Sequence, residues 1–258
     1  MTIDTDFHSH VARSSAYEMV QTAQKKGLRV LGLSEHVFQM TEARPLLEHM
    51  PQEGPLLTFA AYADQVRTAA QSLHFDARLG LEVDFIPGKH EDIQAFVREH
   101  EWVFLIGSVH EINGEMFEVD RKWSREQGEA LWLQYFELLR GAVSSGCFSL
   151  VSHPVRMRTG NAHLPPTLDD ELERLAAEAA HHDVALEVNG YDVLRYPSMV
   201  RRLVQACALH QTPVSVGSDA HIPKQVAQAH EQTEAMLREV GITKVRTWKQ
   251  CVVEEYRF

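Results

Sequence analysis

Seven short apolar segments, spaced along the whole chain, each have at or close to their end a residue type that can bind a metal ion. They are rich in β-branched residues and apolar at successive positions, which is typical of strands buried on both faces of a parallel sheet. The first ends in the His-Ser-His motif at 8–10, and the others span 30–33, 77–83, 102–109, 148–152, 184–188 and 213–217. We therefore predict an α/β fold built on a parallel sheet.

Amphipathic segments separate the apolar ones and predict helices. They span 15–26, 59–73, 124–143, 168–181, 198–210 and 224–240, and Gly27, Gly146 and Gly241 stand where a C-terminal cap belongs. Right-handed crossovers would close this series into a TIM-like (β/α)7 barrel, a single domain over residues 1–258 with its site at the carboxyl ends of the strands. A doubly wound open sheet is the alternative, but only a closed ring lets residues from all the strand ends converge.

Charge and composition argue against several classes of partner. The 258 residues carry a formal net charge of −11 with histidines neutral, which disfavours broad binding to nucleic acid. No stretch approaches the roughly 20 apolar residues of a membrane span, and the first residues lack the pattern of a signal peptide. The three cysteines lie far apart and suit a reducing compartment. We therefore expect a cytoplasmic protein that acts on a small molecule, without a nucleic acid or membrane partner.

Histidines and carboxylates gather at the predicted strand ends. Side chains two positions apart in an extended chain point the same way, so His8 and His10 can reach one metal ion. Glu82 can bridge two ions with its two oxygens, and Asp84 on the same face is its rival. The other predicted ligands are His36, His110, His153, Asp219 and His221. This donor set suits a multinuclear site for zinc, iron or manganese better than one for calcium or magnesium, and Glu35 is expected to support a ligand rather than to bind metal.

In combination, these motifs resemble the PHP (polymerase and histidinol phosphatase) metallohydrolase family, and within it the monofunctional histidinol-phosphate phosphatases. The resemblance extends from His8 to about Gly241. It is carried by HSH at 8–10, SEH at 34–36, GLEVDFIPG at 80–88, IGSVH at 106–110, SHP at 152–154, LEVN at 186–189 and GSDAH at 217–221. It implies a distorted seven-stranded barrel that hydrolyses histidinol phosphate, in histidine biosynthesis, by means of a metal-activated water.

The resemblance also implies how two to three divalent metal ions would share the ligands. The first ion would have four: His8, His10, Glu82 and Asp219. Glu82 would bridge it to a second ion, held also by His110 and His153. The third ion would be held by His36 and His221.

The chain departs from the family pattern after the first motif. The family usually has another histidine or aspartate there, but residues 11–15 read Val-Ala-Arg-Ser-Ser. We therefore expect the third site to have two protein ligands. Water or a phosphate oxygen would complete it, or Arg13 would replace it in part as a phosphate contact.

The same resemblance suggests roles in the reaction. Glu82 and Asp219 would hold the ions that activate the water. His221 or His36, or a water on the third ion, would protonate the leaving group. The predicted substrate-binding residues are Arg156, Arg158, Arg13 and Asn189. Guanidinium groups suit phosphate oxygens, although a solvated loop pair is the alternative for Arg156 and Arg158.

The substrate also carries an amine and an imidazole. Asp84, Glu111 or Asp120 would be available to meet them. A second PHP-type activity, on a nucleotide or a sugar phosphate, is the alternative reaction. A metal-binding module without catalysis is the alternative from a different class.

Overall fold

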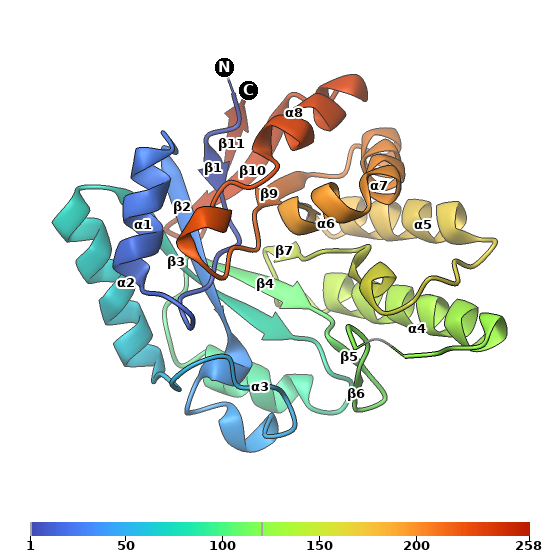
Figure 1. Ribbon diagram of the computed structural model, residues 1–258, viewed down its shortest axis with the longest axis horizontal. Helices are drawn as coiled ribbons and strands as arrows, with labels where there is room; N and C mark the ends of the chain where they lie inside the picture. Colours follow the sequence, from blue (N-terminus) through green and yellow to red (C-terminus); the bar gives the residue numbers. More distant parts are fainter. Residues whose placement is uncertain (1, 120) are drawn as a thin grey trace.

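Seven parallel strands form a ring in the computed structural model of the chain, which describes residues 2–119 and 121–258. In sheet order they are β1 (Thr5–Asp6), β2 (Val30–His36), β3 (Asp76–Asp84), β4 (Phe104–Ser108), β7 (Leu150–Val151), β8 (Ala185–Asn189) and β9 (Val214–Gly217). The ring closes between the segments that follow β1 and β9. The Phe7 nitrogen donates to the Val216 carbonyl oxygen at 2.9 Å, and the Asp219 nitrogen to the His8 carbonyl oxygen at 2.8 Å. The predicted barrel is therefore confirmed (Figure 1).

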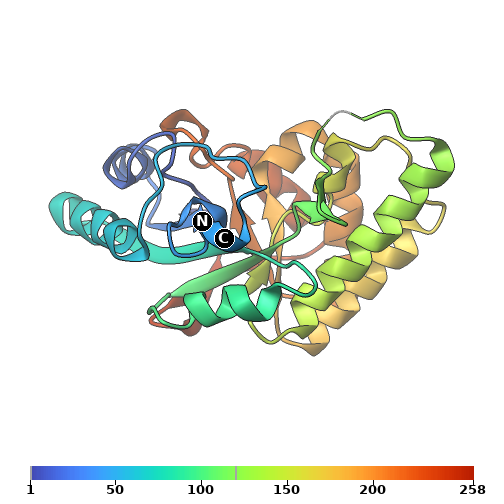
Figure 2. The same cartoon turned by 90° about the horizontal axis from the view of Figure 1, so that it is seen from below.

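Helices cover the outside of the ring (Figures 1 and 2). They are α1 (Ala16–Lys25), α2 (Phe59–Leu73), α3 (His90–Val97), α4 (Arg125–Ser144), α5 (Leu168–His181), α6 (Gly190–Arg195), α7 (Pro197–His210) and α8 (His230–Glu239). Short 3-10 turns stand between them: η1 (Val37–Gln39), η2 (Arg44–Leu46), η3 (Arg156–Thr159) and η4 (Pro223–Gln225). Within the described ranges, none of the helices combines the length and the apolar character needed to cross a membrane.

Two antiparallel hairpins lie outside the ring of parallel strands. β5 (Glu111–Ile112) pairs with β6 (Glu115–Met116), and β10 (Lys244–Lys249) pairs with β11 (Val252–Arg257). Neither hairpin is predicted from the sequence, and neither are α3 and α6. The two-residue strands and α6 contain too few positions to display a hydrophobic period, and β10 and β11 are rich in charged residues.

Two predicted elements differ from those observed by more than two residues at one end. β2 continues to His36, so this histidine lies inside a strand rather than after it. The helix predicted over 224–240 begins only at His230, because Ala227 and Ala229 have φ angles of 55° and 63°. The Asp6 carboxylate accepts from the Ala227 nitrogen at 2.8 Å and holds this irregular segment against β1.

Aromatic side chains fill the barrel at the amino ends of its strands. Phe104 packs edge-on against Phe7, with ring centroids 5.0 Å apart, and Trp248 from β10 stacks on Phe104 at 6.1 Å. Gly32 and Gly80 on the neighbouring strands leave room for Phe104. An alanine Cβ at these positions would lie 2.7 Å and 2.3 Å from the Phe104 Cζ atom. The interior is thus closed at one end, and the site must lie at the other.

The contact between Gly80 and Phe104 yields a stability prediction. Gly80→Ala should destabilise the protein by about 1–3 kcal/mol, because the methyl group overpacks a core without space for it. Adding Phe104→Leu should recover part of that loss, because the ring edge that meets the methyl group is removed. Urea unfolding of the two single variants and the double variant forms a cycle that measures this coupling. Additive losses would contradict the proposed clash.

Candidate metal centre

The eight predicted metal ligands converge at the carboxyl end of the barrel. They lie as follows: His8 and His10 after β1, His36 at the end of β2, Glu82 in β3, His110 after β4, His153 after β7, and Asp219 and His221 after β9. All are buried except His221, whose side chain is 22% exposed. Residues separated by up to 213 positions in sequence therefore share one solvent-poor site.

Glu82 lies at the middle of this site, and its two oxygens face different imidazoles. Oε2 lies near three ring nitrogens: 3.3 Å from His8 Nε2, 3.6 Å from His10 Nε2 and 2.6 Å from His36 Nδ1. Oε1 lies 3.1 Å from His153 Nε2 and 3.4 Å from His110 Nε2. A carboxylate placed in this way can bridge two metal ions.

The donor atoms fall into overlapping groups, each compact enough for one ion. The groups are His8, His10 and Glu82; His36, Glu82 and His110; and His10, His36 and His221, with the atoms of each within 4.8 Å of one another. Asp219 adjoins the first, since its Oδ1 lies 3.3 Å from His10 Nε2. The four ligands implied for the first ion therefore lie together. His36 is implied as a ligand of the third ion alone, but in the structure it belongs to both the second and the third donor group.

A layer of acceptors fixes the orientation of the imidazole rings. His8 Nδ1 lies 2.7 Å from Glu187 Oε1, and His110 Nδ1 lies 2.7 Å from Asp84 Oδ1. Hydrogen bonds of this kind leave the opposite nitrogen free to bind metal. Asp84, the rival of Glu82, thus supports a histidine in this arrangement. Glu187 carries no predicted role, although its place two residues before Asn189 in β8 puts it on the same face.

Glu35 supports the segment after His10, as expected for it. Its Oε2 atom accepts from the Val11 nitrogen at 2.6 Å and from the Ala12 nitrogen at 2.7 Å. Its Oε1 atom lies 3.5 Å from His10 Nδ1. Burial opposes ionisation of Glu35, but the bonds with His10 outweigh it and lower the pKa of the carboxyl to about 2. A charged Glu35 therefore anchors the loop that carries the first motif.

Several buried nitrogen and oxygen atoms that could bind a metal ion have no hydrogen-bond partner within residues 2–119 and 121–258. They include His8 Nε2, His10 Nε2, His36 Nδ1 and Glu82 Oε2. Leaving such atoms unpaired away from water costs free energy. All of them face one another across the centre of the site, so a cation placed there would satisfy several at once. Their nitrogen and oxygen chemistry fits zinc, iron or manganese.

The site also attracts positive charge. Burial alone would lower the pKa of His8, but the carboxylates of Glu187, Glu82 and Asp219 outweigh it and hold that pKa well above its usual value. Burial would likewise raise the pKa of Glu82, yet the surrounding histidines keep it well below its usual range. Metal ions can supply the charge that this field favours.

Arg156 is the predicted substrate-binding arginine that lies at the metal centre. It is buried, with Nε 2.8 Å from Asp192 Oδ1 and Nη2 2.6 Å from Asp219 Oδ2. Its Nη2 atom also donates to Asn189 Oδ1 at 3.1 Å. The alternative of a solvated loop residue is therefore wrong for Arg156.

The other two predicted arginines lie outside the cavity at this centre. The Arg158 guanidinium lies over the Tyr196 ring, 5.6 Å from its centroid. Arg13 has a side chain 52% exposed, and its Nη2 atom pairs with Glu53 Oε1 at 3.0 Å. Arg13 is thus joined to the site through a carboxylate rather than directly.

A cavity of about 110 Å³ opens on the metal centre. Besides predicted ligands and Arg156, it is lined by Phe38, Pro51, Glu53, Met116 and Glu118. These five residues are not predicted from the sequence, because they lie in loops, in the short turn η1 and in the hairpin strand β6, whose course the strand pattern does not determine.

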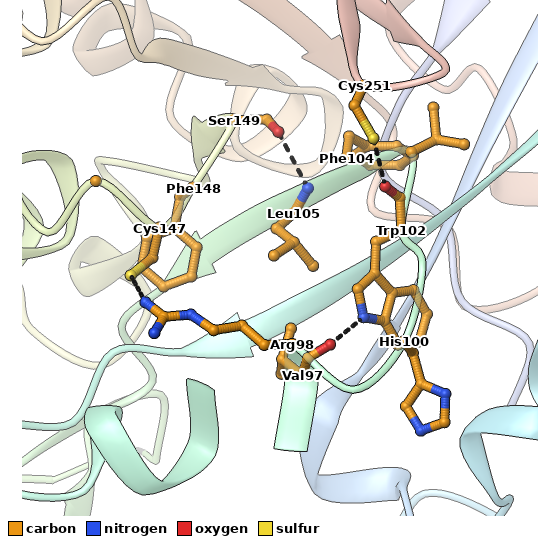
Figure 3. Close-up of a pocket in the computed structure, with 12 residues that line it drawn as sticks. Val97, Arg98, His100, Trp102, Phe104, Leu105, Cys147, Phe148, Ser149 and Cys251 are labelled. Atoms are coloured by element: carbon orange, nitrogen blue, oxygen red, sulfur yellow. Dashed lines mark hydrogen bonds between the residues drawn. The ribbon is translucent and has the colours of Figure 1, made fainter. Parts of the chain in front are cut away.

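A larger cavity of about 460 Å³ lies near the start of β4, away from these ligands (Figure 3). Its residues include Arg98, Trp102, Cys147 and Cys251, and the Cys251 thiol donates to the Trp102 carbonyl oxygen at 3.1 Å. No carboxylate belongs to its described lining. We therefore place the chemistry of the protein at the smaller cavity.

Comparisons with known proteins agree with this geometry. The model of the PHP domain family matches residues 4–190. A probable histidinol-phosphatase of Deinococcus radiodurans is 28% identical over 261 residues, with 93% of this chain and 95% of that protein covered. The crystal structure of a histidinol phosphate phosphatase from Lactococcus lactis, with zinc, L-histidinol and phosphate, has a TM-score of 0.79 at 17% identity, covering 98% of this chain and 99% of that one. A structure of archaeal ribonuclease P with mature tRNA has a TM-score of 0.55 at 13% identity, covering 92% and 87%.

The overlapping donor groups yield a prediction about metal content. Protein purified without a chelator should contain at least two transition-metal ions per chain, because Glu82 and its histidines form at least two sites. Removal of the ions should lower the melting temperature, since ligands that bind only the folded state stabilise it. Elemental analysis and thermal unfolding measure both. Less than one ion per chain, with no change of melting temperature on adding Zn²⁺, Mn²⁺ or Fe²⁺, would contradict the assignment.

Proposed function

This chain belongs to the PHP domain family, and on that premise we propose that it hydrolyses histidinol phosphate to histidinol and phosphate. The observation that carries the proposal is the buried cluster of histidines around Glu82, with the Arg156 guanidinium at the same cavity. The similar protein of Deinococcus radiodurans is described as a probable histidinol-phosphatase. The similar Lactococcus lactis structure contains zinc, L-histidinol and phosphate.

The proposed metal ligands follow from the contacts above. His8, His10, Glu82 and Asp219 would hold one ion, and Glu82, His110 and His153 a second. When bound, two close divalent ions lower the pKa of a water, orient it and neutralise charge on phosphoryl oxygens. Phosphoryl transfer needs little beyond such positioning and charge stabilisation.

Arg156 has two tasks in this proposal. Through Nη2 it holds Asp219 in place, with the two groups 2.6 Å apart in a buried setting. Its Nη1 atom is held less tightly, 3.6 Å from Glu118 Oε1, so it can donate to a phosphate oxygen. Asn189 completes the arrangement, because its side chain contacts Arg156, Asp219 and Glu187.

His221 is better suited to binding metal than to protonating the leaving group. Burial and the nearby His10 lower the pKa of His221 to about 4, so its ring is neutral at pH 7. Its Nδ1 atom lies 3.1 Å from the Asp219 carbonyl oxygen, which orients Nε2 into the site. A water in the site is then the proton donor that we propose for the leaving alkoxide.

The cavity offers acidic groups for the cationic part of the substrate. Glu118 lines it with a side chain 28% exposed, and among the described residues its one ion pair is the long contact of 3.6 Å to Arg156. Asp84 is occupied by His110, and Glu111 is paired with His49. Asp120 lies outside the described residues. We therefore favour Glu118 as the partner of the substrate ammonium group, in a cytoplasmic enzyme of histidine biosynthesis.

The substrate assignment is tested by a panel of phosphate monoesters on the metal-loaded protein. Histidinol phosphate should have a kcat/KM on the order of 10²-fold above those of nucleoside monophosphates and sugar phosphates, because only it presents a cation to Glu118. Released phosphate is the measured quantity. A nucleotide or sugar phosphate that is hydrolysed faster would replace the proposed substrate, and no hydrolysis of any monoester would refute the enzymatic function.

The two carboxylates of β3 should differ in their importance for catalysis. Glu82→Gln removes both the charge and the bridge between ions, so most activity and at least one ion should be lost. Asp84→Asn should cost less, about 10–100-fold, because Asp84 only orients His110. Rates and metal contents of the two variants are compared with those of the parent protein. Equal losses, or the reverse order, would mean that the bridging carboxylate is misassigned.

A further inference from the structure

The loop of residues 11–15, which follows the first motif, has no histidine or acid that could bind a metal ion. The carboxylate of Glu53, from another part of the chain, lies beside this loop. His10, His36 and His221 form the outermost donor group. Glu53 approaches it from the connection between η2 and α2, and its Oε2 atom lies 3.4 Å from His221 Nε2. We propose that Glu53 is the ligand that completes a third metal site with His36 and His221. The proposal deepens the metal-dependent function above and rests on it.

Two potential metal ligands face each other at this point. The Nδ1 atom of His221 lies 3.1 Å from the Asp219 carbonyl oxygen, which can only accept, so Nδ1 carries a hydrogen and Nε2 is the nitrogen available to a metal ion. Glu53 Oε2 is buried and has no hydrogen-bond partner in the described part of the chain. A cation between Nε2 and Oε2 would bind both atoms.

The distance between these two atoms suits a shared ion. Metal bonds of about 2.0–2.2 Å to nitrogen and oxygen, at tetrahedral angles, put two ligand atoms about 3.4 Å apart. The Glu53 side chain is 13% exposed, so it is largely withdrawn from water. It also lines the cavity above the metal centre together with His36 and His221.

The backbone around Glu53 is held by contacts with Gln39 and with the loop after the first motif. The buried side chain of Gln39 is oriented so that its amide oxygen accepts from the Glu53 nitrogen at 2.7 Å and from the Gly54 nitrogen at 3.1 Å. Gly54 packs against the loop after the first motif, since an added Cβ would lie 2.2 Å from the Ala12 carbonyl oxygen. This close approach brings Glu53 next to the loop that lacks a ligand.

Arg13 contributes to the same arrangement. Its Nη2 atom donates to Glu53 Oε1 at 3.0 Å, which leaves Oε2 as the oxygen that faces His221. The loop of residues 11–15 thus provides a positioning cation instead of a metal ligand. This account replaces the expectation of a third site with only two protein ligands, and it replaces the direct phosphate contact expected of Arg13.

The test compares metal binding by the parent protein, Glu53→Gln and Glu118→Gln. Glutamine keeps the shape of the side chain, and Glu118 is a matched control because it lines the same cavity without contacting a predicted ligand histidine. Apoprotein is titrated with Zn²⁺, and bound ions are counted after dialysis. The parent and Glu118→Gln should bind three ions. Glu53→Gln should keep two with unchanged affinity and bind the third about tenfold or more weakly.

A second variant and a second readout sharpen the result. Glu53→His should restore the third ion, because imidazole is also a zinc ligand. Unchanged affinity at the two inner sites shows that each variant is folded. Three ions bound with parental affinity by Glu53→Gln would overturn the proposal, as would an equal loss in Glu118→Gln. Because ions are counted without substrate, this result stands apart from whether histidinol phosphate is hydrolysed.

Discussion

The structure is organised around an excess of electron-pair donors that are buried at one end of a barrel. Five imidazoles surround the Glu82 carboxylate within 3.6 Å, and further acids lie directly behind them. Such a buried cluster favours positive charge, which the carboxylates around His8 attract and which metal ions can supply. The fold tolerates it since the opposite end of the barrel is sealed by Phe7, Phe104 and Trp248. Apolar packing stabilises the ring at the amino ends of the strands, and the metal centre lies at their carboxyl ends.

Function depends as much on the supporting layer as on the donors. Glu187 and Asp84 fix the rings of His8 and His110, and Arg156 fixes Asp219. All three partners are buried, and Glu187 and Arg156 are each held by several hydrogen bonds. The donors are thereby oriented before any ion arrives, which lowers the reorganisation needed on binding. This explains why so many charged groups lie inside a protein of modest size.

The sequence predicts the barrel and its eight candidate ligands, because strands buried on both faces appear as continuous apolar runs and the candidates stand at or close to the ends of these runs. It fails where position depends on tertiary contacts. Glu53 and Glu118 lie in connections whose path is set by packing, such as that of Gly54 on Ala12. Arg13 is predicted as a phosphate contact, but its pairing with Glu53, forty residues away, cannot be read from sequence spacing. Similarly, the late start of α8 follows from a bond between Ala227 and Asp6, more than two hundred residues away.

The closure of the ring between β1 and β9 has a consequence for how the protein is made. His8 meets Asp219 only when the first and last strands of the barrel are side by side, so the first ion site cannot exist on a partly synthesised chain. Closing a loop of this length is slow and entropically costly. A metal ion that binds between the first and last strands stabilises the closed ring and not the open chain. An ion held by both His8 and Asp219 would therefore stabilise the closed ring relative to a chain whose last strand is not yet in place.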